Sequence, residues 1–355
     1  MFGFFSRKGP QVAHISPSGN SIEVGPEDNL LKAALDHGLA WPHNCRVGSC
    51  GQCKCKLVSG KIKPPNDFSY VLTGEELDAG MILACQTRLR SEVEIEVALD
   101  QTTAKLSPPK SIGGVIANAR QLTHDILAVH IKLDESIPPY LAGQYAELSV
   151  PGVIDKPRSY SFASAPEKEL PGHVSFYIRH VPNGEMTTWL HTENRVGQRV
   201  SVTGPYGSFW LRDSNAPMLC IAGGSGLAPI KALLEQVSEC GFQRRVVFVF
   251  GARTRDDLYC LDDMRRIKER GKGQFDFVPV LSREPEGSDW SGLRGNCTDI
   301  LSYDGFDIPN SHAYLCGPPG MIDSAIDALT RGCMSQENIF FDKFFDASNM
   351  QGARI

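Results

Sequence analysis

The stretch HNCRVGSCGQCKC, residues 43–55, is the most informative part of this chain. Within it Cys45, Cys50 and Cys53 stand at C-x4-C-x2-C spacing, and a fourth cysteine, Cys85, follows after 31 intervening residues. Four thiolates at this spacing are typical of proteins that hold a [2Fe–2S] cluster in a tight loop. The sequence therefore predicts that these four cysteines are the ligands of such a cluster.

Other features of the stretch limit the alternatives. Gly48 and Gly51 allow the backbone to pass close to the sulfurs without Cβ clashes. A structural zinc site more often has two short cysteine pairs, and the chain has no second C-x2-C. Cys55 is a fifth candidate ligand. Because residues 53–58 alternate like a strand, Cys55 should lie about 6–7 Å beyond Cys53, and we interpret it as a bystander.

Length and composition restrict the class of protein. A chain of 355 residues with 41% hydrophobic and 22% charged residues is typical of a soluble protein of two or three domains. The net charge of −5 argues against nucleic acid as the main partner. No apolar run approaches the roughly 18 residues that span a bilayer. Residues 1–8 are apolar and could contact a membrane peripherally or a partner, but a disordered leader is the simpler interpretation.

The cysteine content indicates a reducing compartment. The 11 cysteines are an odd number, several lie in apolar runs, and four appear committed to a cluster, so a disulfide scaffold is not indicated. We expect a cytoplasmic protein.

Residues 1–100 are expected to form an α+β domain of the β-grasp [2Fe–2S] ferredoxin type. A hairpin is predicted over 12–24, a short helix over 30–35 and a strand over 54–58. A second short helical stretch is expected before Cys85. Residues 93–97 alternate as an edge-type strand, with its glutamates on a solvated face. Residues 101–112 contain two adjacent prolines and lack periodicity, which predicts a linker.

Residues 113–213 are predicted to form an antiparallel β-barrel domain. Its evidence is six short alternating segments separated by glycine and proline turns, at 114–117, 126–133, 144–150, 159–164, 174–180 and 199–202. The barrel carries two motifs, R-S-Y-S at 158–161 and G-E-M-T at 184–187. An arginine can pair with a pyrophosphate, a tyrosine can cover a flat ring, and a helix start offers N–H donors to a phosphate.

Residues 214–355 are predicted to form an α/β domain with a parallel sheet, because strand-like and helical segments now alternate. The strand 217–222 leads through the glycine-rich turn 223–226 into the helix 230–239, an arrangement that lets a dinucleotide pyrophosphate approach the backbone. A later strand ends in C-G-P-P at 316–319. The Cys316 thiol is either a packed core group or a thiol beside a nicotinamide site.

Together these elements resemble the ferredoxin–NAD(P)H reductase superfamily over about residues 10–345. The chain is similar in particular to the single-chain reductases of bacterial multicomponent oxygenases, such as those of xylene monooxygenase, benzoate dioxygenase and phenol hydroxylase. The resemblance rests on the cluster cysteines, the four motifs above and the closing segment F-D-K-F at 341–344.

The resemblance implies roles for individual residues. It implies FAD contacts through Arg158, Tyr160, Ser161, Gly184 and Thr187. Nicotinamide-nucleotide contacts are implied for Gly223, Gly224, Gly226, Pro229, Cys316, Gly317 and Pro318, and the chemistry of Arg253 makes it a further candidate contact of the same nucleotide. It also places Tyr160, Ser161, Cys316 and Phe344 beside the reacting rings.

The implied activity is that of an NAD(P)H-dependent oxidoreductase. Electrons from NADH would pass through FAD and the [2Fe–2S] cluster, one at a time, to a terminal oxygenase (Rieske or di-iron) or its ferredoxin, for aromatic or hydrocarbon hydroxylation. NADH is favoured over NADPH. Arg253 and Arg255 could pair with the 2′-phosphate of NADPH, but the neighbouring carboxylates of Asp256 and Asp257 would repel it. Alternatives are a deoxysugar dehydrase/reductase system as the client and, more remotely, a redox-sensing module with a structural metal. A monomer is expected.

One surface feature has two interpretations. The basic residues Arg46, Lys54 and Lys56 lie next to the cluster motif, and they are either an electrostatic docking face for the electron acceptor or ordinary surface charge.

Overall fold

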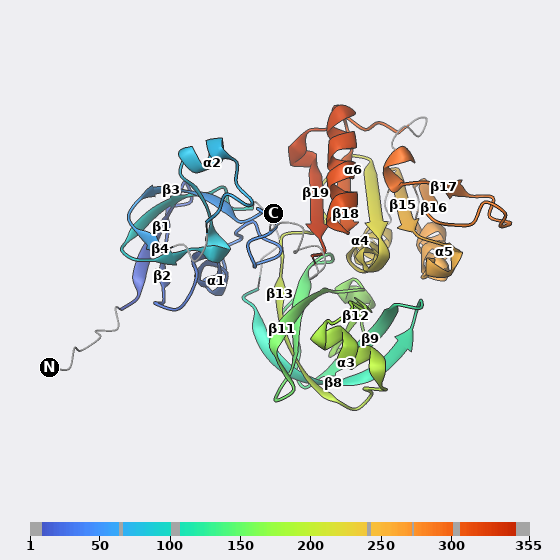
Figure 1. The fold of residues 1–355 in the computed structure, drawn as a ribbon, viewed down its shortest axis with the longest axis horizontal. Coiled ribbons are helices and arrows are strands. Elements are labelled where there is room, and N and C mark those ends of the chain that lie inside the picture. Colours follow the sequence, from blue (N-terminus) through green and yellow to red (C-terminus); the bar gives the residue numbers. More distant parts are fainter. Residues whose placement is uncertain are drawn as a thin grey trace. The chain divides into compact units, whose positions relative to one another are not determined.

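The computed structural model describes residues 9–63, 67–100, 107–239, 243–271, 273–300 and 306–345. These residues form two compact units (Figure 1). Of the described residues, the first unit contains those up to Pro109 together with 206–208, and the second contains Lys110–Pro205 and those from Phe209 to residue 345. The apolar segment 1–8, for which a peripheral contact was considered, lies outside the described residues.

The first unit is built on a five-stranded sheet of order β2-β1-β7-β3-β5. Its strands are β1 (Gln11–Ser16), β2 (Asn20–Val24), β3 (Lys54–Ser59), β5 (Met81–Leu83) and β7 (Val93–Glu96), with β4 (Ile62–Lys63) and β6 (Arg88–Leu89) forming a separate pair. Strands β1 and β7 pair in parallel, whereas the β1–β2, β3–β5 and β3–β7 pairs are antiparallel. This mixed sheet confirms the predicted α+β class.

Capping residues determine where the two short helices of this unit begin. Helix α1 (Leu30–Asp36) begins at Asn29, whose side chain accepts a hydrogen bond from the Lys32 amide at 2.8 Å. Helix α2 (Gly74–Asp78) begins at Thr73, which forms a reciprocal capping box with Glu76. Both helices occur where the sequence predicts them.

The expectation that 93–97 is an edge-type strand is wrong. Strand β7 lies between β1 and β3 and pairs with both. The alternation was interpreted correctly with respect to faces, because Val93 and Ile95 are buried while Glu94 is exposed. Alternation reports which face of a strand is buried, and it carries no information on how many neighbours the strand has.

The second unit begins with a six-stranded sheet of order β11-β10-β13-β8-β9-β12. The strands are β8 (Lys110–Gln121), β9 (Ile126–Leu133), β10 (Tyr145–Val150), β11 (Ile154–Ser161), β12 (His173–Arg179) and β13 (Arg199–Tyr206). An antiparallel bridge between Phe162, directly after β11, and Phe176, in the middle of β12, joins the two outer strands and so closes the sheet into a barrel. Helix α3 (Glu185–Thr192) follows β12. Strand β8 takes in residues 110–112 of the predicted linker, of which residues 101–106 lie outside the described chain.

The remainder of this unit is a parallel sheet of order β17-β16-β15-β14-β18-β19. Its strands are β14 (Met218–Gly223), β15 (Val246–Ala252), β16 (Phe275–Leu281), β17 (Leu293–Arg294), β18 (His312–Gly317) and β19 (Ile339–Lys343). The helices are α4 (Leu227–Glu239), α5 (Leu261–Arg270) and α6 (Pro319–Arg331). The predicted parallel α/β domain is thus confirmed.

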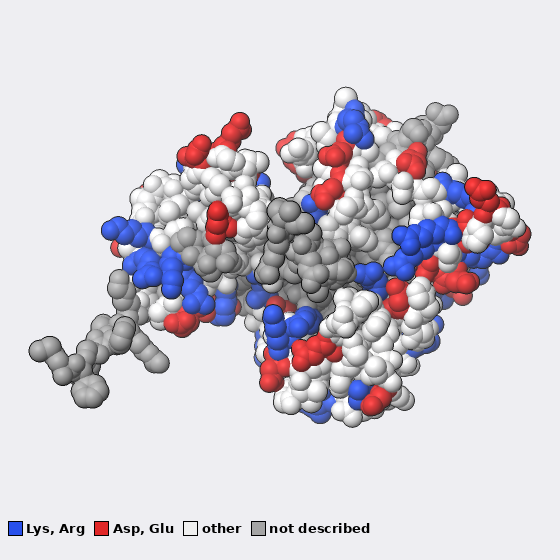
Figure 2. Space-filling model, viewed as in Figure 1, with Lys and Arg blue, Asp and Glu red and all other residues white. Residues whose placement is uncertain are grey.

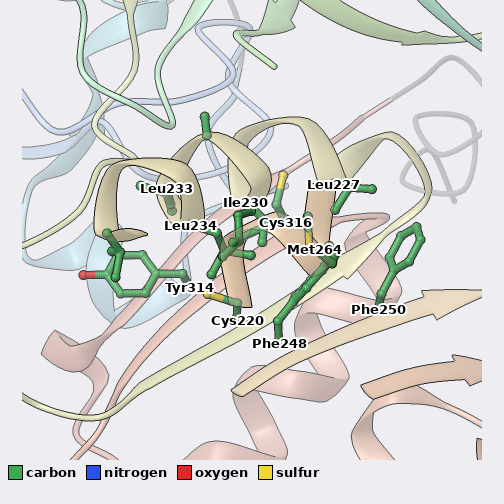
Figure 3. Packing of buried hydrophobic residues seen from close by; sticks show 14 of the residues in the cluster. Cys220, Leu227, Ile230, Leu233, Leu234, Phe248, Phe250, Met264, Tyr314 and Cys316 are labelled. Carbon is green, nitrogen blue, oxygen red and sulfur yellow. The ribbon is translucent and has the colours of Figure 1, made fainter. Parts of the chain in front are cut away.

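Helix α4 is the best-packed helix of the sheet's first face. Figure 3 shows Leu227, Ile230 and Leu234 directed toward side chains of the strands beneath. Each of these three is at most 1% exposed, and burying such a side chain contributes about 1.5–3 kcal/mol. A second cluster, which includes Val247, Val249 and residues of α6, covers the opposite face.

No helix in the described parts of the chain is both long enough and apolar enough to cross a membrane.

Candidate functional site

The four cysteines of the predicted cluster come together in the first unit as two pairs. The thiols of Cys45 and Cys50 share a hydrogen bond, and those of Cys53 and Cys85 share another. Backbone amides of Ser49 and Cys50 donate to the Cys45 sulfur at 3.3 and 3.4 Å. Two irons with two thiolates each would be satisfied by this arrangement, so the residues present fit a [2Fe–2S] cluster.

Within the first cysteine pair the thiolate is favoured at Cys45, whereas the hydrogen bond to Cys45 and burial raise the pKa of Cys50. The hydrogen bond from the Cys50 thiol, together with backbone amides, lowers the pKa of Cys45 to about 5. The loop conformation that turns these amides inward uses left-handed backbone at Gly48 (φ +85°) and Gly51 (φ +71°). A Cβ on Gly48 would lie 2.7 Å from the side chains of Gln86 and Tyr70, so close packing also requires glycine there.

Cys55 lies outside this constellation. It sits in strand β3 with 1% exposure, in the same core as Cys53 and Cys85, but among the described residues no thiol–thiol hydrogen bond joins it to another cysteine. Burial raises the pKa of its thiol. The structure therefore favours the interpretation of Cys55 as a bystander.

His43, which sequence reasoning did not select, is buried at the start of the cluster loop, 5% exposed. Its Nδ1 donates to the Trp41 carbonyl at 2.7 Å, while its Nε2 accepts from the amide of Gly207 at 2.9 Å. Burial lowers the pKa of His43 to about 4, consistent with a neutral ring that both donates and accepts. The side chain thus holds residues 206–208 within the first unit. A lone histidine before a cysteine motif carries no sequence signal for this role.

Two of the three basic residues near the motif are already engaged within this unit. The Lys54 ammonium pairs with Glu76 at 2.6 Å. The Arg46 guanidinium lies 3.8 Å from the centroid of the Tyr206 ring. In Figure 2 most cationic side chains on the visible face of the first unit gather at its lower left, and anionic side chains stand at its top. The docking interpretation of Arg46, Lys54 and Lys56 stays a prediction.

The two barrel motifs meet at the start of helix α3. Arg158, at the end region of β11, places its guanidinium 3.7 Å from the carboxylate of Glu185, the first residue of α3. A cationic side chain beside a helix N-terminus is suited to bind a pyrophosphate. Gly184 caps this helix, and a Cβ there would lie 2.6 Å from the Thr187 hydroxyl. The arrangement fits the phosphate groups of FAD.

Individual barrel residues take different positions. Tyr160 packs on the barrel core, and burial raises the pKa of its phenol. Ser161 is 6% exposed. The Thr187 hydroxyl shares its proton between the carbonyls of Val181 and Gly184, both at 3.2 Å, and accepts from the Val181 amide at 3.1 Å, so it stabilises the turn before α3. A contact of Thr187 with FAD remains a prediction.

The two nucleotide loops pack backbone against backbone at the carboxyl ends of neighbouring parallel strands. Strands β14 and β18 pair with Ala222 opposite Cys316, and each leads directly into its loop. A Cβ on Gly226 would lie 2.3 Å from the Cys316 carbonyl oxygen, and Gly317 has φ +147°. This edge of an open parallel sheet is where nucleotides bind. Gly226 and Gly317 are buried where the two loops meet, so the absence of side chains there permits this close packing of backbone on backbone.

The remaining predicted residues flank these loops. Gly223, Gly224 and Pro229 lie in or just after the turn, with Pro229 buried in the first turns of α4. The Cys316 side chain is fully buried among core residues near Leu227 and Met264 (Figure 3), and burial raises the pKa of its thiol, which favours the core interpretation. Pro318 precedes α6. The Phe344 amide donates to the Gly317 carbonyl at 2.9 Å, which ties the closing aromatic segment to the second loop.

Arg253 and Arg255, the two arginines considered for a 2′-phosphate, follow strand β15 and have different surroundings. Arg253 is exposed at the end of the strand. The Arg255 guanidinium is 2.5 Å from Asp289 and 4.0 Å from Glu284. Asp257 accepts hydrogen bonds from the amide and hydroxyl of Thr254, at 2.9 and 3.0 Å. Two acidic residues from a different loop, rather than Asp257, therefore offset the charge of Arg255.

Tyr259 is a second residue that sequence reasoning missed. It is 5% exposed, and its hydroxyl donates to the Gly224 carbonyl at 2.9 Å. The Tyr259 side chain thereby stabilises the first nucleotide loop, Gly224–Gly226, through its backbone. A tyrosine followed by helix-forming residues gives no sequence signal of this contact, which depends on the fold.

Comparison with known families assigns each part of the chain separately. Residues 13–90 match the 2Fe-2S iron-sulfur cluster binding domain, residues 114–210 the oxidoreductase FAD-binding domain and residues 220–327 the oxidoreductase NAD-binding domain. These ranges contain the cysteine pairs, the barrel motifs and the nucleotide loops described above.

Relatives match over nearly the whole chain. The xylene/toluene monooxygenase electron transfer component of Pseudomonas putida is 36% identical over 351 residues, covering 97% of this chain and 96% of the relative. The phenol 2-monooxygenase reductase component of Pseudomonas sp. (strain CF600) is 35% identical over 342 residues, covering 95% of each.

Solved structures agree with the sequence relatives. The Amycolatopsis cytochrome P450 reductase has a TM-score of 0.83 at 32% identity, covering 95% of this chain and 99% of that chain. The ferredoxin reductase in carbazole 1,9a-dioxygenase has a TM-score of 0.74 at 27% identity, covering 95% and 98%.

Proposed function

This chain belongs to the family of single-chain [2Fe–2S] flavin reductases that serve as electron transfer components of oxygenases, and on that basis we propose that it passes electrons from NADH to a terminal oxygenase. The observation that carries the proposal is the pairing of four cysteine thiols in one unit, in a chain that also contains flavin and nucleotide motifs. Bound FAD would accept a hydride, and the cluster would take up electrons singly.

The protein's own part is to bind and orient these groups. Cys45 and Cys50 would hold one iron, and Cys53 and Cys85 the other. Arg158 and the start of α3 would bind the FAD pyrophosphate, and Tyr160 and Ser161 would face the flavin ring. The loops after β14 and β18 would bind the nicotinamide nucleotide, with Phe344 beside the flavin. The two thiol pairs, the position of Arg158 beside α3 and the packing of the two loops support the first, second and fourth of these assignments.

NADH is the proposed reductant in preference to NADPH. A 2′-phosphate is recognised by free cations near the end of the second strand of such a sheet. Arg255 is already paired with Asp289 and lies near Glu284, which lowers its capacity to bind another anion. The exposed Arg253 leaves some capacity for NADPH.

The proposed partner is an oxygenase component, of the Rieske or di-iron type, or a ferredoxin that serves it. Two relatives that match 97% and 95% of this chain are named as components of xylene/toluene monooxygenase and phenol 2-monooxygenase. We propose that this chain acts as a monomer in the cytoplasm.

An anaerobic titration with NADH tests the proposal. NADH delivers two electrons, whereas FAD takes two and the cluster one, so complete reduction should need about 1.5 equivalents. Absorbance should show bleaching of the flavin, and low-temperature EPR should show a reduced cluster. Flavin reduction without a cluster signal would contradict the assigned ligands. An unchanged flavin would contradict the reductase function as a whole.

A further inference from the structure

Helix α4, which follows the first nucleotide loop, carries a buried ion pair. The Lys231 ammonium is 2.5 Å from a carboxylate oxygen of Glu235, one turn further along the helix. The two side chains are only 5% and 11% exposed. Most ion pairs within one helix lie on its solvated surface, where they help to keep the protein soluble. A buried pair does not contribute to solubility, so its presence needs another explanation.

Both charged groups also reach a single segment of the barrel. The Lys231 ammonium donates to the Ala163 carbonyl at 3.1 Å and contacts the Ser164 hydroxyl at 3.3 Å. The second carboxylate oxygen of Glu235 accepts from the Ala165 amide at 3.0 Å. The three donors of the ammonium thus have three acceptors, which is the condition under which a buried charge is tolerated.

The segment that receives these bonds is part of the flavin-binding strand region. Residues 163–165 come directly after the R-S-Y-S motif and Phe162. They are held from the barrel side by Tyr140, which stacks on Phe162 at 3.9 Å and donates to the Ser164 carbonyl at 3.2 Å. The segment is therefore a fixed part of the barrel.

At its other end the ion pair belongs to the nucleotide-binding half. Helix α4 starts at Leu227, immediately after the turn Gly224–Gly226. A helix is stiff over this length, so fixing Lys231 and Glu235 against the barrel also fixes the turn. The ion pair therefore links residues 163–165, which follow the flavin motif, to the turn Gly224–Gly226, which would bind the nicotinamide nucleotide.

Apolar contacts alone do not provide this constraint. The shared core at this junction contains small and aliphatic side chains, among them Ile126, Ala142, Leu227 and Ile230. Such contacts are non-directional, whereas the three hydrogen bonds from the pair to residues 163–165 define both distance and orientation. Replacing a buried ion pair by apolar residues is often neutral for stability, so stability alone does not explain its presence.

We propose that Lys231 and Glu235 are positioning residues for hydride transfer, which hold the nucleotide-binding helix at a fixed distance from the flavin-binding strand. The inference rests on the proposed function, in which a hydride, two electrons with one proton, leaves the nicotinamide C4 and is accepted by the flavin N5. Such a transfer requires reacting atoms about 3–3.5 Å apart and is slowed by small displacements.

The double variant Lys231→Met/Glu235→Gln tests this proposal. It removes both charges together, and the glutamine retains an acceptor for the Ala165 amide. Stopped-flow absorbance should show the rate constant of flavin reduction at saturating NADH falling at least about tenfold. The dissociation constant of an unreactive tetrahydro-NADH should change less than about twofold, since the nucleotide loops themselves are unaltered. The charge-transfer band of that analogue with the flavin should weaken, and the urea midpoint should stay close to that of the parent.

Glu239→Gln is the matched control. Glu239 lies on the same helix and pairs with Lys168 of the same barrel, but on the exposed side of the junction. Reduction rate and charge-transfer band should be unchanged in this variant, since a solvated pair constrains little.

The outcomes separate the proposals. A folded double variant with parental rate and charge-transfer band would overturn the positioning role. If the double variant does not fold, Glu235→Gln alone retains the lysine contacts and should lower the rate by a smaller factor; a parental rate would again overturn the role. Failure of NADH to reduce the parent protein would contradict the proposed function instead.

Discussion

Cys53 and Cys55 are two residues apart and equally buried, yet their surroundings differ. Cys53, Cys55 and Cys85 lie in the same apolar core, but the Cys53 thiol shares a hydrogen bond with the Cys85 thiol, whereas burial is the main influence on the thiol of Cys55. The distinction matters because five cysteines compete for four ligand positions in this unit.

For Cys55→Ala we expect a full complement of cluster and a loss of about 1 kcal/mol in the free energy of unfolding, from the lost packing of a small buried group. Iron and sulfide analysis with the visible spectrum would measure the first, and urea unfolding the second. Loss of cluster in this variant would show that Cys55 is a ligand.

Arg158 is the cationic residue of the R-S-Y-S motif, and its guanidinium lies beside the start of α3. We expect Arg158→Ala to weaken FAD binding by about 10- to 100-fold, since a hydrogen bond to a charged group contributes about 1.5–3 kcal/mol. Flavin fluorescence during FAD titration of the deflavinated protein would measure this. The control is Arg199→Ala. Arg199 is an exposed residue of β13 that pairs with Asp134, and this variant should bind FAD normally.

At the scale of elements, the decisive feature is how the turn between β14 and α4 packs on the end of β18. A Cβ at Gly226 would come within 2.3 Å of the Cys316 carbonyl oxygen and 2.9 Å of the Gly317 Cα. Both are main-chain atoms, so a side chain there has to displace one of the two loops.

We expect Gly226→Ala to raise KM for NADH by about tenfold or more, since overpacking costs typically 1–3 kcal/mol and 1.4 kcal/mol corresponds to a factor of ten. Steady-state kinetics with ferricyanide would measure it. Gly320→Ala, in α6 where a Cβ meets open space, is the matched control. An unchanged KM in Gly226→Ala would show that the nucleotide does not use this turn.

At the scale of the whole molecule, the cluster ligands and the flavin and nucleotide motifs belong to separate compact units. This division predicts that the two kinds of electron transfer can be separated. NADH oxidation with a small acceptor needs only the second unit's motifs, whereas one-electron delivery to a protein acceptor needs the cluster.

In Cys85→Ser we expect the cluster to be lost or unstable, because one of the two thiol pairs is broken. NADH-dependent reduction of ferricyanide should persist at about the parental rate, and reduction of cytochrome c should fall at least about tenfold. Spectrophotometric assays of both acceptors on the same preparation would measure this. Equal loss of both activities would mean that the units depend on each other for folding.

The sequence alone determined the features that depend on local pattern. Cysteine spacing identified Cys45, Cys50, Cys53 and Cys85, and the change from alternating segments to alternating strands and helices identified the barrel and the parallel sheet. Glycine-rich turns between strand and helix marked the nucleotide loops. These patterns are reliable because spacing and periodicity are constrained by the geometry of one element or one loop.

Only the tertiary structure decided which residues from distant segments meet. The central position of β7, the bond of His43 to Gly207 and the support of Gly224 by Tyr259 each join residues far apart in the chain. Lys231 and Glu235 have the spacing of an ordinary exposed helical pair, and burial by the barrel gives them their contacts. Sequence periodicity reports the faces of an element, whereas the partner of each face is chosen by the packing of the whole chain.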